Sequence, residues 1–356
     1  MTIATQPAVR STTPLVDDDH EQVVVRQDAD TGLRFIVAVH STVLGPALGG
    51  MRLKRYPGGL REALEDVMGL ARTMTLKASA VGLDIGGGKS VMIDDGRAER
   101  REARLEVAAA VIDELGGKYI TAEDIGTTTA DMDHLARFTR FVTGRSMEHG
   151  GRGDPSPVTA ESVFQALRRG LGAATGSAEL DGRRIGVVGL GKVGYVLAAK
   201  LAAAGGRIVA CDLDPELGER FASEHGGEIA PSAEAIMATE LDVLAPCAGG
   251  GLIDEPLARS IDCRVIVGAA NNQLTSRAVA RVLAERGILY VPDFLANCGG
   301  LIQVSLEWQG RGGEDELILR AMDRLDRAIV TAEAEDSTPL DVAERQALER
   351  VEAARQ

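Results

Sequence analysis

The pattern of apolar and polar residues changes about halfway along the chain. In the first half, residues 23–25 and 33–39 are short apolar runs on either side of a polar turn, which predicts two strands joined as a hairpin. Residues 59–75 and 99–115 repeat their apolar side chains at helical spacing. Residues 119–124 predict a strand that ends in two carboxylates, and such a pair can also cap a turn or a helix.

Two glycine-rich stretches interrupt this first half. Residues 45–52 predict a loop. The glycines at 86–88 precede an apolar run at 90–93. They predict a place where the backbone turns sharply or approaches a neighbour closely, followed by a buried strand.

Residues 183–291 instead alternate short apolar strands with helices. The predicted strands cover residues 185–189, 207–212, 242–245, 265–268 and 288–291, and the predicted helices include residues 192–204 and 215–225. This alternation is typical of a parallel sheet wrapped by helices. The glycine and proline cluster at 150–157 predicts a hinge. Two further helices are predicted at 314–334 and 338–351.

A glycine motif stands between the first two of these elements. Gly189, Gly191 and Gly194 form a Gly-x-Gly-x-x-Gly turn after a predicted strand and before a predicted helix. Asp212 ends the next strand, about 20 residues further on, where the ribose-binding acid of a dinucleotide site belongs. No arginine directly follows Asp212, which favours NAD over NADP. The plainer alternative is a tight glycine turn without a ligand.

These patterns define an α/β fold class with two domains and a cleft between them. We expect an N-terminal α/β substrate domain over residues 1–150 and a Rossmann-type, doubly wound dinucleotide-binding domain over residues 151–330. The C-terminal helices, about residues 331–356, could pack back on the first domain.

Composition narrows the class of partner. The chain of 356 residues is long enough for two domains, and its formal net charge of −14 disfavours nucleic acid and anionic membranes. We therefore expect a small-molecule partner. No apolar run approaches the ~20 residues that span a bilayer. Residues 1–19 lack the apolar core of a secretory signal and are expected to be a loose tail.

Cysteine and histidine usage points to the compartment and against a metal. The four cysteines contain no Cys-x-x-Cys pair, so we expect reduced thiols in a cytoplasmic protein. The five histidines are scattered without a His-x-x-x-His spacing, so we expect no metal site.

Lysine is rare in this chain, which draws attention to Lys77 and Lys89. Among the 39 Lys and Arg residues, the lysines are Lys54, Lys77, Lys89, Lys118, Lys192 and Lys200. Chance use of lysine rather than arginine at both 77 and 89 has a probability of roughly 2%, and the choice matters because only lysine can lose its proton near neutral pH. The plainer alternative is that both are solvated surface charges.

Seven motifs occur together along the chain. They are Gly45-Pro-Ala-Leu-Gly-Gly-Met-Arg52, Met74-Thr-Leu-Lys77, Gly86-Gly-Gly-Lys89, Glu123-Asp-Ile-Gly-Thr127, Pro155-Ser-Pro-Val-Thr159, Gly268-Ala-Ala-Asn-Asn-Gln273 and Asn297-Cys-Gly-Gly300. Over about residues 40–305 the chain resembles the amino-acid dehydrogenases that act on glutamate, leucine, phenylalanine and valine. The resemblance implies NAD-dependent, reversible oxidative deamination of an L-amino acid to a 2-oxo acid and ammonia.

The resemblance also implies roles for individual residues. Lys77 would bind the substrate carboxylate, Lys89 would be the base that activates water, and Asp124 would relay protons and contact the amino group. The substrate side chain would meet Leu48, Gly49, Met74, Ala122, Thr143, Leu301 and Val304. The cofactor would contact Thr159, Gly189, Leu190, Gly191, Lys192, Val193, Gly194 and Asp212, with Asn271 near both the nicotinamide and the substrate. A lysine held beside another cation in a cleft has its charged form disfavoured, which suits a base.

This side-chain pocket favours an apolar substrate. None of its residues is charged, so a glutamate side chain would be buried without a partner, at a cost of several kcal/mol. Ala122 and Leu301 leave less depth than an aromatic ring needs, which favours leucine, valine and isoleucine. Phenylalanine is the alternative substrate, because residues 144–148, 245–248 and 289–294 resemble the phenylalanine enzymes.

A function of another class is a non-catalytic NAD-binding protein. Such a protein would need none of Lys77, Lys89 and Asp124, so their joint presence favours an enzyme. The resembling enzymes form symmetric assemblies, and we expect a homo-oligomer here.

Overall fold

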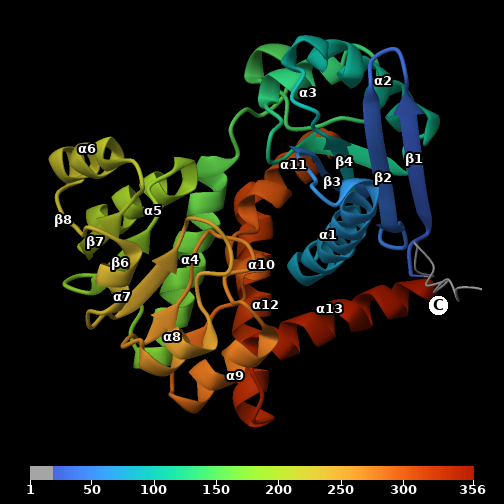
Figure 1. Ribbon diagram of the computed structural model, residues 1–356. Coiled ribbons are helices and arrows are strands. Elements are labelled where there is room, and N and C mark those ends of the chain that lie inside the picture. The colour runs from blue at the N-terminus through green and yellow to red at the C-terminus, as the bar shows by residue number, and fades with distance from the viewer. Residues whose placement is uncertain (1–18) are drawn as a thin grey trace, which may run out of the picture.

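The chain folds around two separate sheets, as the computed structural model of residues 19–356 shows (Figure 1). A five-stranded sheet comes from the first half of the chain and a six-stranded sheet from the second half. This arrangement confirms the predicted two-domain α/β fold. The expected tail over residues 1–19 lies almost entirely outside the described residues, and the domain boundaries near residue 150 stay a prediction.

The first sheet has the strand order β1-β2-β4-β3-β5. Its strands are β1 (Gln22–Asp28), β2 (Leu33–Ser41), β3 (Ala47–Lys54), β4 (Gly86–Ile93) and β5 (Tyr119–Glu123). β1 and β2 form the predicted antiparallel hairpin, whereas β3 runs parallel to both β4 and β5. Alternation along the strands turns Ile36 and Val91 to one face and Phe35 and Met92 to the other.

The predicted loop over residues 45–52 is wrong, because this stretch contains β3. Gly45, with a φ of +134°, lies before the strand, whereas Gly49 and Gly50 within it are required by neighbouring backbone. A Cβ at Gly49 would lie 1.8 Å from the carbonyl oxygen of Gly88, and one at Gly50 would lie 2.6 Å from that of Glu123. Glycine in a strand commonly marks such a close approach.

The glycine run before Lys89 also lies in a strand. Gly86, Gly87 and Gly88 open β4 with ordinary negative φ, so the predicted close approach is confirmed and the sharp turn is not. A Cβ at Gly87 would lie 2.1 Å from the backbone nitrogen of Thr75. The run therefore lets the helix that carries Lys77 pack directly against the strand that carries Lys89.

Helix α1 (Gly59–Val81) covers one face of the first sheet and is longer than predicted. Its apolar stripe, which includes Val67 and Ala71, packs on β2 and β4. The helix ends at Gly82, whose left-handed backbone (φ 85°) donates its N–H to the carbonyls of Ala78 and Ser79. Lys77 consequently lies within the last turns of the helix and not just beyond its end.

The other face of the first sheet is covered by α2 (Arg101–Glu114), which follows the short 3-10 turn η1 (Ala98–Arg100). Helix α3 (Thr129–Leu135) and a second 3-10 turn, η2 (Met147–His149), lie along the chain between β5 and the second half. The first sheet is thus a buried layer between helices.

The second sheet has the order β11-β10-β9-β6-β7-β8, and its strand pairs are all parallel. Its strands are β6 (Arg184–Val188), β7 (Arg207–Cys211), β8 (Glu228–Ile229), β9 (Val243–Pro246), β10 (Val265–Ile266) and β11 (Leu289–Tyr290). The helices between them are α5 (Lys192–Ala203), α6 (Pro215–His225), α7 (Ala233–Met237), α8 (Glu255–Ser260) and α9 (Arg277–Glu285). The predicted parallel sheet is confirmed, although the short β8 has no counterpart among the predicted strands.

The remaining helices connect the two sheets. They are α4 (Ser156–Thr175), α10 (Asp293–Ala296), α11 (Gly299–Gln309), α12 (Glu314–Ala334) and α13 (Pro339–Arg355). Helix α13 runs from the second half to α1 (Figure 1), where the Ser79 hydroxyl donates to the Ala347 carbonyl at 2.7 Å. Arg350 donates to the Leu83 carbonyl at 2.8 Å. The last helix therefore packs on the first half of the chain.

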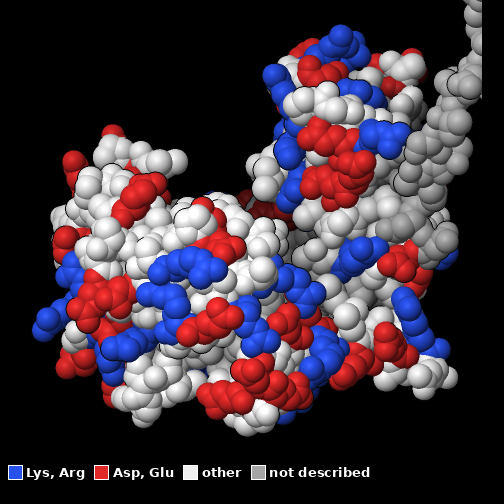
Figure 2. All heavy atoms as spheres, turned by 60° about the horizontal axis from the view of Figure 1, so that its bottom comes forward, with Lys and Arg blue, Asp and Glu red and all other residues white. Residues whose placement is uncertain are grey.

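The surface carries charges of both signs. On the face shown in Figure 2, acidic and basic side chains are interspersed, and the face is hollowed between two lobes. Within residues 19–356, no helix is both long and apolar enough to cross a membrane.

Candidate active site

A cavity of about 710 Å³ lies between the two halves of the molecule. Its walls are α1 and the first sheet on one side, and on the other the segments that follow β10 and β11. The carboxyl ends of parallel strands are where open α/β sheets usually bind ligands. The predicted residues that line it are Leu48, Gly49, Met74, Lys77, Lys89, Ala122, Asp124, Asn271, Leu301 and Val304.

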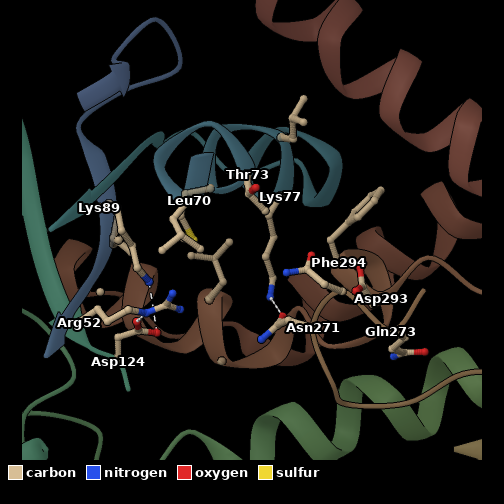
Figure 3. A pocket seen from close by; sticks show the side chains of 18 of the residues that line it. Arg52, Leu70, Thr73, Lys77, Lys89, Asp124, Asn271, Gln273, Asp293 and Phe294 are labelled. Atoms are coloured by element: carbon tan, nitrogen blue, oxygen red, sulfur yellow. Dashed lines mark hydrogen bonds and ion pairs between the residues drawn. The ribbon is translucent and has the colours of Figure 1, made fainter. Parts of the chain in front are cut away.

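Lys77 projects from α1 into the middle of this cavity (Figure 3). Its Nζ donates to the Asn297 Oδ1 at 2.6 Å and lies 3.5 Å from the Asn271 Oδ1. Burial lowers the pKa of Lys77, and the nearby Asp293 carboxylate opposes this shift. An anion that enters the cavity would therefore stabilise the protonated form of Lys77.

Asn297 holds this arrangement together, although the sequence analysis gave it no role. It is buried, and its Nδ2 donates to the Asn271 Oδ1 at 2.9 Å and to the Ala269 carbonyl at 3.0 Å. One amide thereby fixes both Lys77 and the loop that carries Asn271. The signal that could have identified Asn297 from the sequence was its place in the Asn-Cys-Gly-Gly motif.

Lys89 projects from β4 at the other end of the cavity (Figure 3). It is only 5% exposed, which excludes a solvated surface charge. Its Nζ lies 3.2 Å from the Asp124 Oδ1. A Cβ at position 50 would lie 2.7 Å from the Asp124 Cβ, so Gly50 gives Asp124 the room to reach Lys89.

Arg52 is the functional residue that the sequence analysis missed at this end. Its Nε donates to the Asp124 Oδ2 at 2.8 Å, and its Nη1 lies 3.1 Å from the Asp66 Oδ2. Arg52 closes the Gly-Gly-Met-Arg motif and lines the cavity. Treating that motif as a loop hid the strand register that brings Arg52 to Asp124.

These contacts set the protonation of the Lys89 end. Burial lowers the pKa of Lys89, Asp124 opposes that shift, and the Arg52 guanidinium adds to it. The expected neighbouring cation is thus Arg52. Although burial alone would raise it, the charges of Lys89 and Arg52 hold the pKa of Asp124 below its usual range. The two side-chain oxygens of Asp124 therefore pair with Arg52 and Lys89 instead of capping a turn.

The apolar part of the cavity is formed by Leu48, Met74, Ala122, Leu301 and Val304. Thr143 does not line it, contrary to expectation. The Thr143 side chain is fully buried, and its hydroxyl donates to the Val304 carbonyl at 2.8 Å. It supports the pocket from behind instead of touching what enters it.

The predicted cofactor turn lies outside this cavity, between β6 and α5. Gly189 has a φ of +103°, and a Cβ there would lie 2.8 Å from the Ala248 nitrogen. A Cβ at Gly194 would lie 2.1 Å from the Gly189 carbonyl oxygen, whereas one at Gly191 would meet nothing within 4 Å. Two of the glycines thus close the turn, and the third leaves open space at a helix N-terminus without a side-chain cap. This open space at a helix N-terminus fits a pyrophosphate, which is the role of such a glycine turn in dinucleotide-binding sites. The whole turn consists of Gly189, Leu190, Gly191, Lys192, Val193 and Gly194.

Asp212 follows β7 beside this turn. Its Oδ2 accepts the Leu190 N–H at 2.6 Å and its Oδ1 accepts the Asp214 N–H at 3.0 Å. It therefore fixes the turn, and each oxygen keeps a second lone pair for a ribose hydroxyl. The Thr159 hydroxyl donates to the Pro155 carbonyl at 2.9 Å, and Thr159 is outside the cavity lining, so its contact with the cofactor stays a prediction.

A glycine turn that fits a dinucleotide, together with a cavity into which two lysines project, is the combination expected of a nicotinamide-dependent dehydrogenase. Residues 20–141 match the family model for the dimerisation domain of Glu/Leu/Phe/Val dehydrogenases, and residues 217–356 match the model for Glutamate/Leucine/Phenylalanine/Valine dehydrogenase. Residues 184–247, around the glycine turn, also match a model described as NADP oxidoreductase, coenzyme F420-dependent. The chain belongs to the glutamate/leucine/phenylalanine/valine dehydrogenase family.

Individual relatives agree with this assignment. The chain is 40% identical to leucine dehydrogenase from Geobacillus stearothermophilus, over 95% of this chain and 92% of that protein. It is 45% identical to valine dehydrogenase from Streptomyces virginiae, over 82% of each chain. The crystal structure of L-tryptophan dehydrogenase from Nostoc punctiforme is similar in fold, with a TM-score of 0.82 and 31% identity over 95% of this chain and 97% of that one.

Proposed function

We propose that this protein catalyses the NAD-dependent, reversible oxidative deamination of branched-chain L-amino acids to 2-oxo acids and ammonia. The observation that carries the proposal is the pair of lysines, Lys77 half-buried and Lys89 buried, that line one cavity with different partners. Lys77 faces neutral amides, and Lys89 faces a carboxylate. A non-catalytic NAD-binding protein would need neither arrangement.

Lys77 is suited to bind the substrate carboxylate. The amide oxygens of Asn271 and Asn297 orient its ammonium without cancelling the charge. An incoming carboxylate would place an anion in direct contact with this ammonium, and such charge-assisted hydrogen bonds are strong. The α-carbon would then be held in the space between Lys77 and Lys89.

Lys89 is suited to act as the base. Bound NAD would accept the hydride from the substrate α-carbon, which leaves a substrate iminium that water must attack. Because burial lowers its pKa, Lys89 gives up its own proton more readily than a solvated lysine and can then take the proton of that water. Asp124 holds Lys89 in place and is the acceptor available to the substrate amino group.

The glycine turn and Asp212 would hold the NAD. The open space at Gly191 admits the pyrophosphate, and Asp212 would accept hydrogen bonds from the adenosine ribose. The carboxylate of Asp212 would also repel the 2′-phosphate of NADP, which supports NAD as the preferred cofactor.

The cavity supports an aliphatic substrate over glutamate. It contains more charges than the sequence analysis expected, because Arg52, Glu123 and Arg277 also line it. Arg52 is paired with Asp66 and Asp124, and Arg277 with Asp341 and Glu344. A second substrate carboxylate would therefore displace existing ion pairs, at a cost of several kcal/mol.

The test is a kinetic panel in which reduced-nicotinamide absorbance is followed with NAD or NADP and single L-amino acids at alkaline pH. We expect overlapping activity on leucine, valine and isoleucine, since one methylene changes kcat/KM by only about 10- to 200-fold. A higher kcat/KM for phenylalanine than for every branched-chain substrate would overturn the substrate assignment. Absence of activity with all of them would overturn the proposed function.

We also propose that the protein acts as a cytoplasmic homo-oligomer. The free cysteines and the match of residues 20–141 to a dimerisation domain support this. Measurement of the mass in solution by light scattering tests the oligomeric state.

A further inference from the structure

A row of charged groups extends behind Asp124, away from Lys89. Asp124 places one oxygen 3.2 Å from the Lys89 Nζ and accepts the Arg52 Nε with the other, at 2.8 Å. Arg52 in turn contacts Asp66, and the Tyr56 hydroxyl donates to the Asp66 Oδ2 at 2.6 Å. The row therefore alternates cation and anion from the cavity to the base of α1.

The row depends on the strand register of the first sheet. Met51 pairs with Ser90 on β4 and with Glu123 on β5, so Arg52 lies one position beyond, beside the end of β5 where Asp124 follows. Alternation puts Lys89 and Arg52 on the same face of the sheet, which α1 covers. Helix α1 supplies Asp66 from above.

The single carboxylate of Asp124 interacts with two cations, Lys89 and Arg52. If Arg52 were removed, the second oxygen would lose its partner in a partly buried site, and the whole negative charge would act on Lys89. The carboxylate would then hold a proton on Lys89 more strongly and would be free to rotate. Arg52 limits both effects.

We propose that Arg52, anchored by Asp66, is a positioning residue of the reaction: it keeps Asp124 aimed at Lys89 and limits how firmly Asp124 holds the proton of Lys89. The inference rests on the proposed function. Arg52 would then belong to the site although it neither takes part in hydride transfer nor binds the substrate carboxylate.

The charges around Lys89 predict the direction in which its pKa changes when Arg52 or Asp66 is replaced. The titratable and charged groups that line the cavity with Lys89 at this end are Asp124 and Glu123 at the end of β5, Arg52 on β3 and Lys77 on α1. Asp66 and Tyr56 lie behind Arg52, and the buried Tyr119 donates to Ser90 on the other face of the sheet. Arg52 lowers the pKa of Lys89 and Asp66 raises it. Because the base acts in its neutral form, kcat for deamination rises with pH through the pKa of Lys89.

The experiment compares pH profiles of kcat, with saturating L-leucine and NAD, for wild type, Arg52→Gln and Asp66→Asn. The midpoint should move to higher pH in Arg52→Gln by about one unit, and to lower pH by less in Asp66→Asn. Arg52→Lys should keep the midpoint within a few tenths of a unit while kcat falls. A loss of kcat without a shift in Arg52→Gln, or shifts of both variants in one direction, would overturn the proposal.

A second readout separates this inference from the proposed function. The pH dependence of acetylation of Lys89 by trace acetic anhydride, followed by mass spectrometry, reports the same midpoint without turnover. It should move with the same two signs, even in a protein that fails the amino-acid panel. Arg101→Gln is the matched control, since Arg101 pairs with Asp131 outside the cavity and should leave the midpoint unchanged. If Arg52→Gln fails to fold, the downward shift in Asp66→Asn decides the outcome.

Discussion

The two ends of the cavity hold the same kind of side chain in opposite surroundings. At one end the Lys77 ammonium is hydrogen-bonded to neutral amides, which orient it, while the nearby Asp293 carboxylate favours its charged form. At the other end Lys89 meets a carboxylate that it shares with Arg52. The difference teaches that the partners, and not the lysine itself, separate an anion-binding role from a proton-accepting role.

Removal of the base should have the largest effect on this comparison. Lys89→Ala is expected to lower kcat by about 10²- to 10⁴-fold, because proton transfer from water loses its acceptor. NADH affinity should be unchanged, since the glycine turn lies outside the cavity. Steady-state kinetics and NADH fluorescence titration measure the two quantities. Turnover within tenfold of wild type would remove Lys89 from the base role.

Removal of the anion-binding lysine should act mainly through substrate affinity. Lys77→Ala is expected to raise the KM for the amino acid by about 10- to 150-fold, which is the value of one charge-assisted hydrogen bond. The same kinetic assay checks it. An unchanged KM would show that the substrate carboxylate binds elsewhere.

A further test gives Lys77 a carboxylate partner like the one that Lys89 has. Asn297→Asp places a carboxylate 2.6 Å from Lys77, where the amide oxygen now lies. The new anion should compete with the substrate carboxylate and raise KM on the order of tenfold. Asn297→Gln keeps the amide and serves as the uncharged control. Equal KM increases in both variants would show a packing effect instead.

Helices and the parallel sheet could be predicted where several local signals agreed. Helix α6 occupies its predicted range, residues 215–225, because Asp214 caps it and Pro215 opens it. The period of apolar residues likewise predicted the hairpin of β1 and β2. Local chemistry was sufficient in these places.

The sequence misled where glycine served packing between distant segments. Gly49 and Gly50 read as a loop, but each makes room for backbone or side-chain atoms more than thirty residues away in sequence, at Gly88, Glu123 and Asp124. Missing β3 also concealed the register that brings Arg52 to Asp124. Asn297 was missed for a related reason, since its partners, Lys77 and Asn271, meet it only in the folded chain.

The most direct test of the division between the two lysines is chemical rescue by a small primary amine. Methylamine added to Lys89→Ala should restore part of kcat in proportion to its free-base concentration, because a neutral amine can occupy the emptied space beside Asp124. The kcat of Lys77→Ala should not respond, since that site needs a fixed cation and not a base. Rescue of kcat in Lys77→Ala but not in Lys89→Ala would contradict the assignment of the two roles.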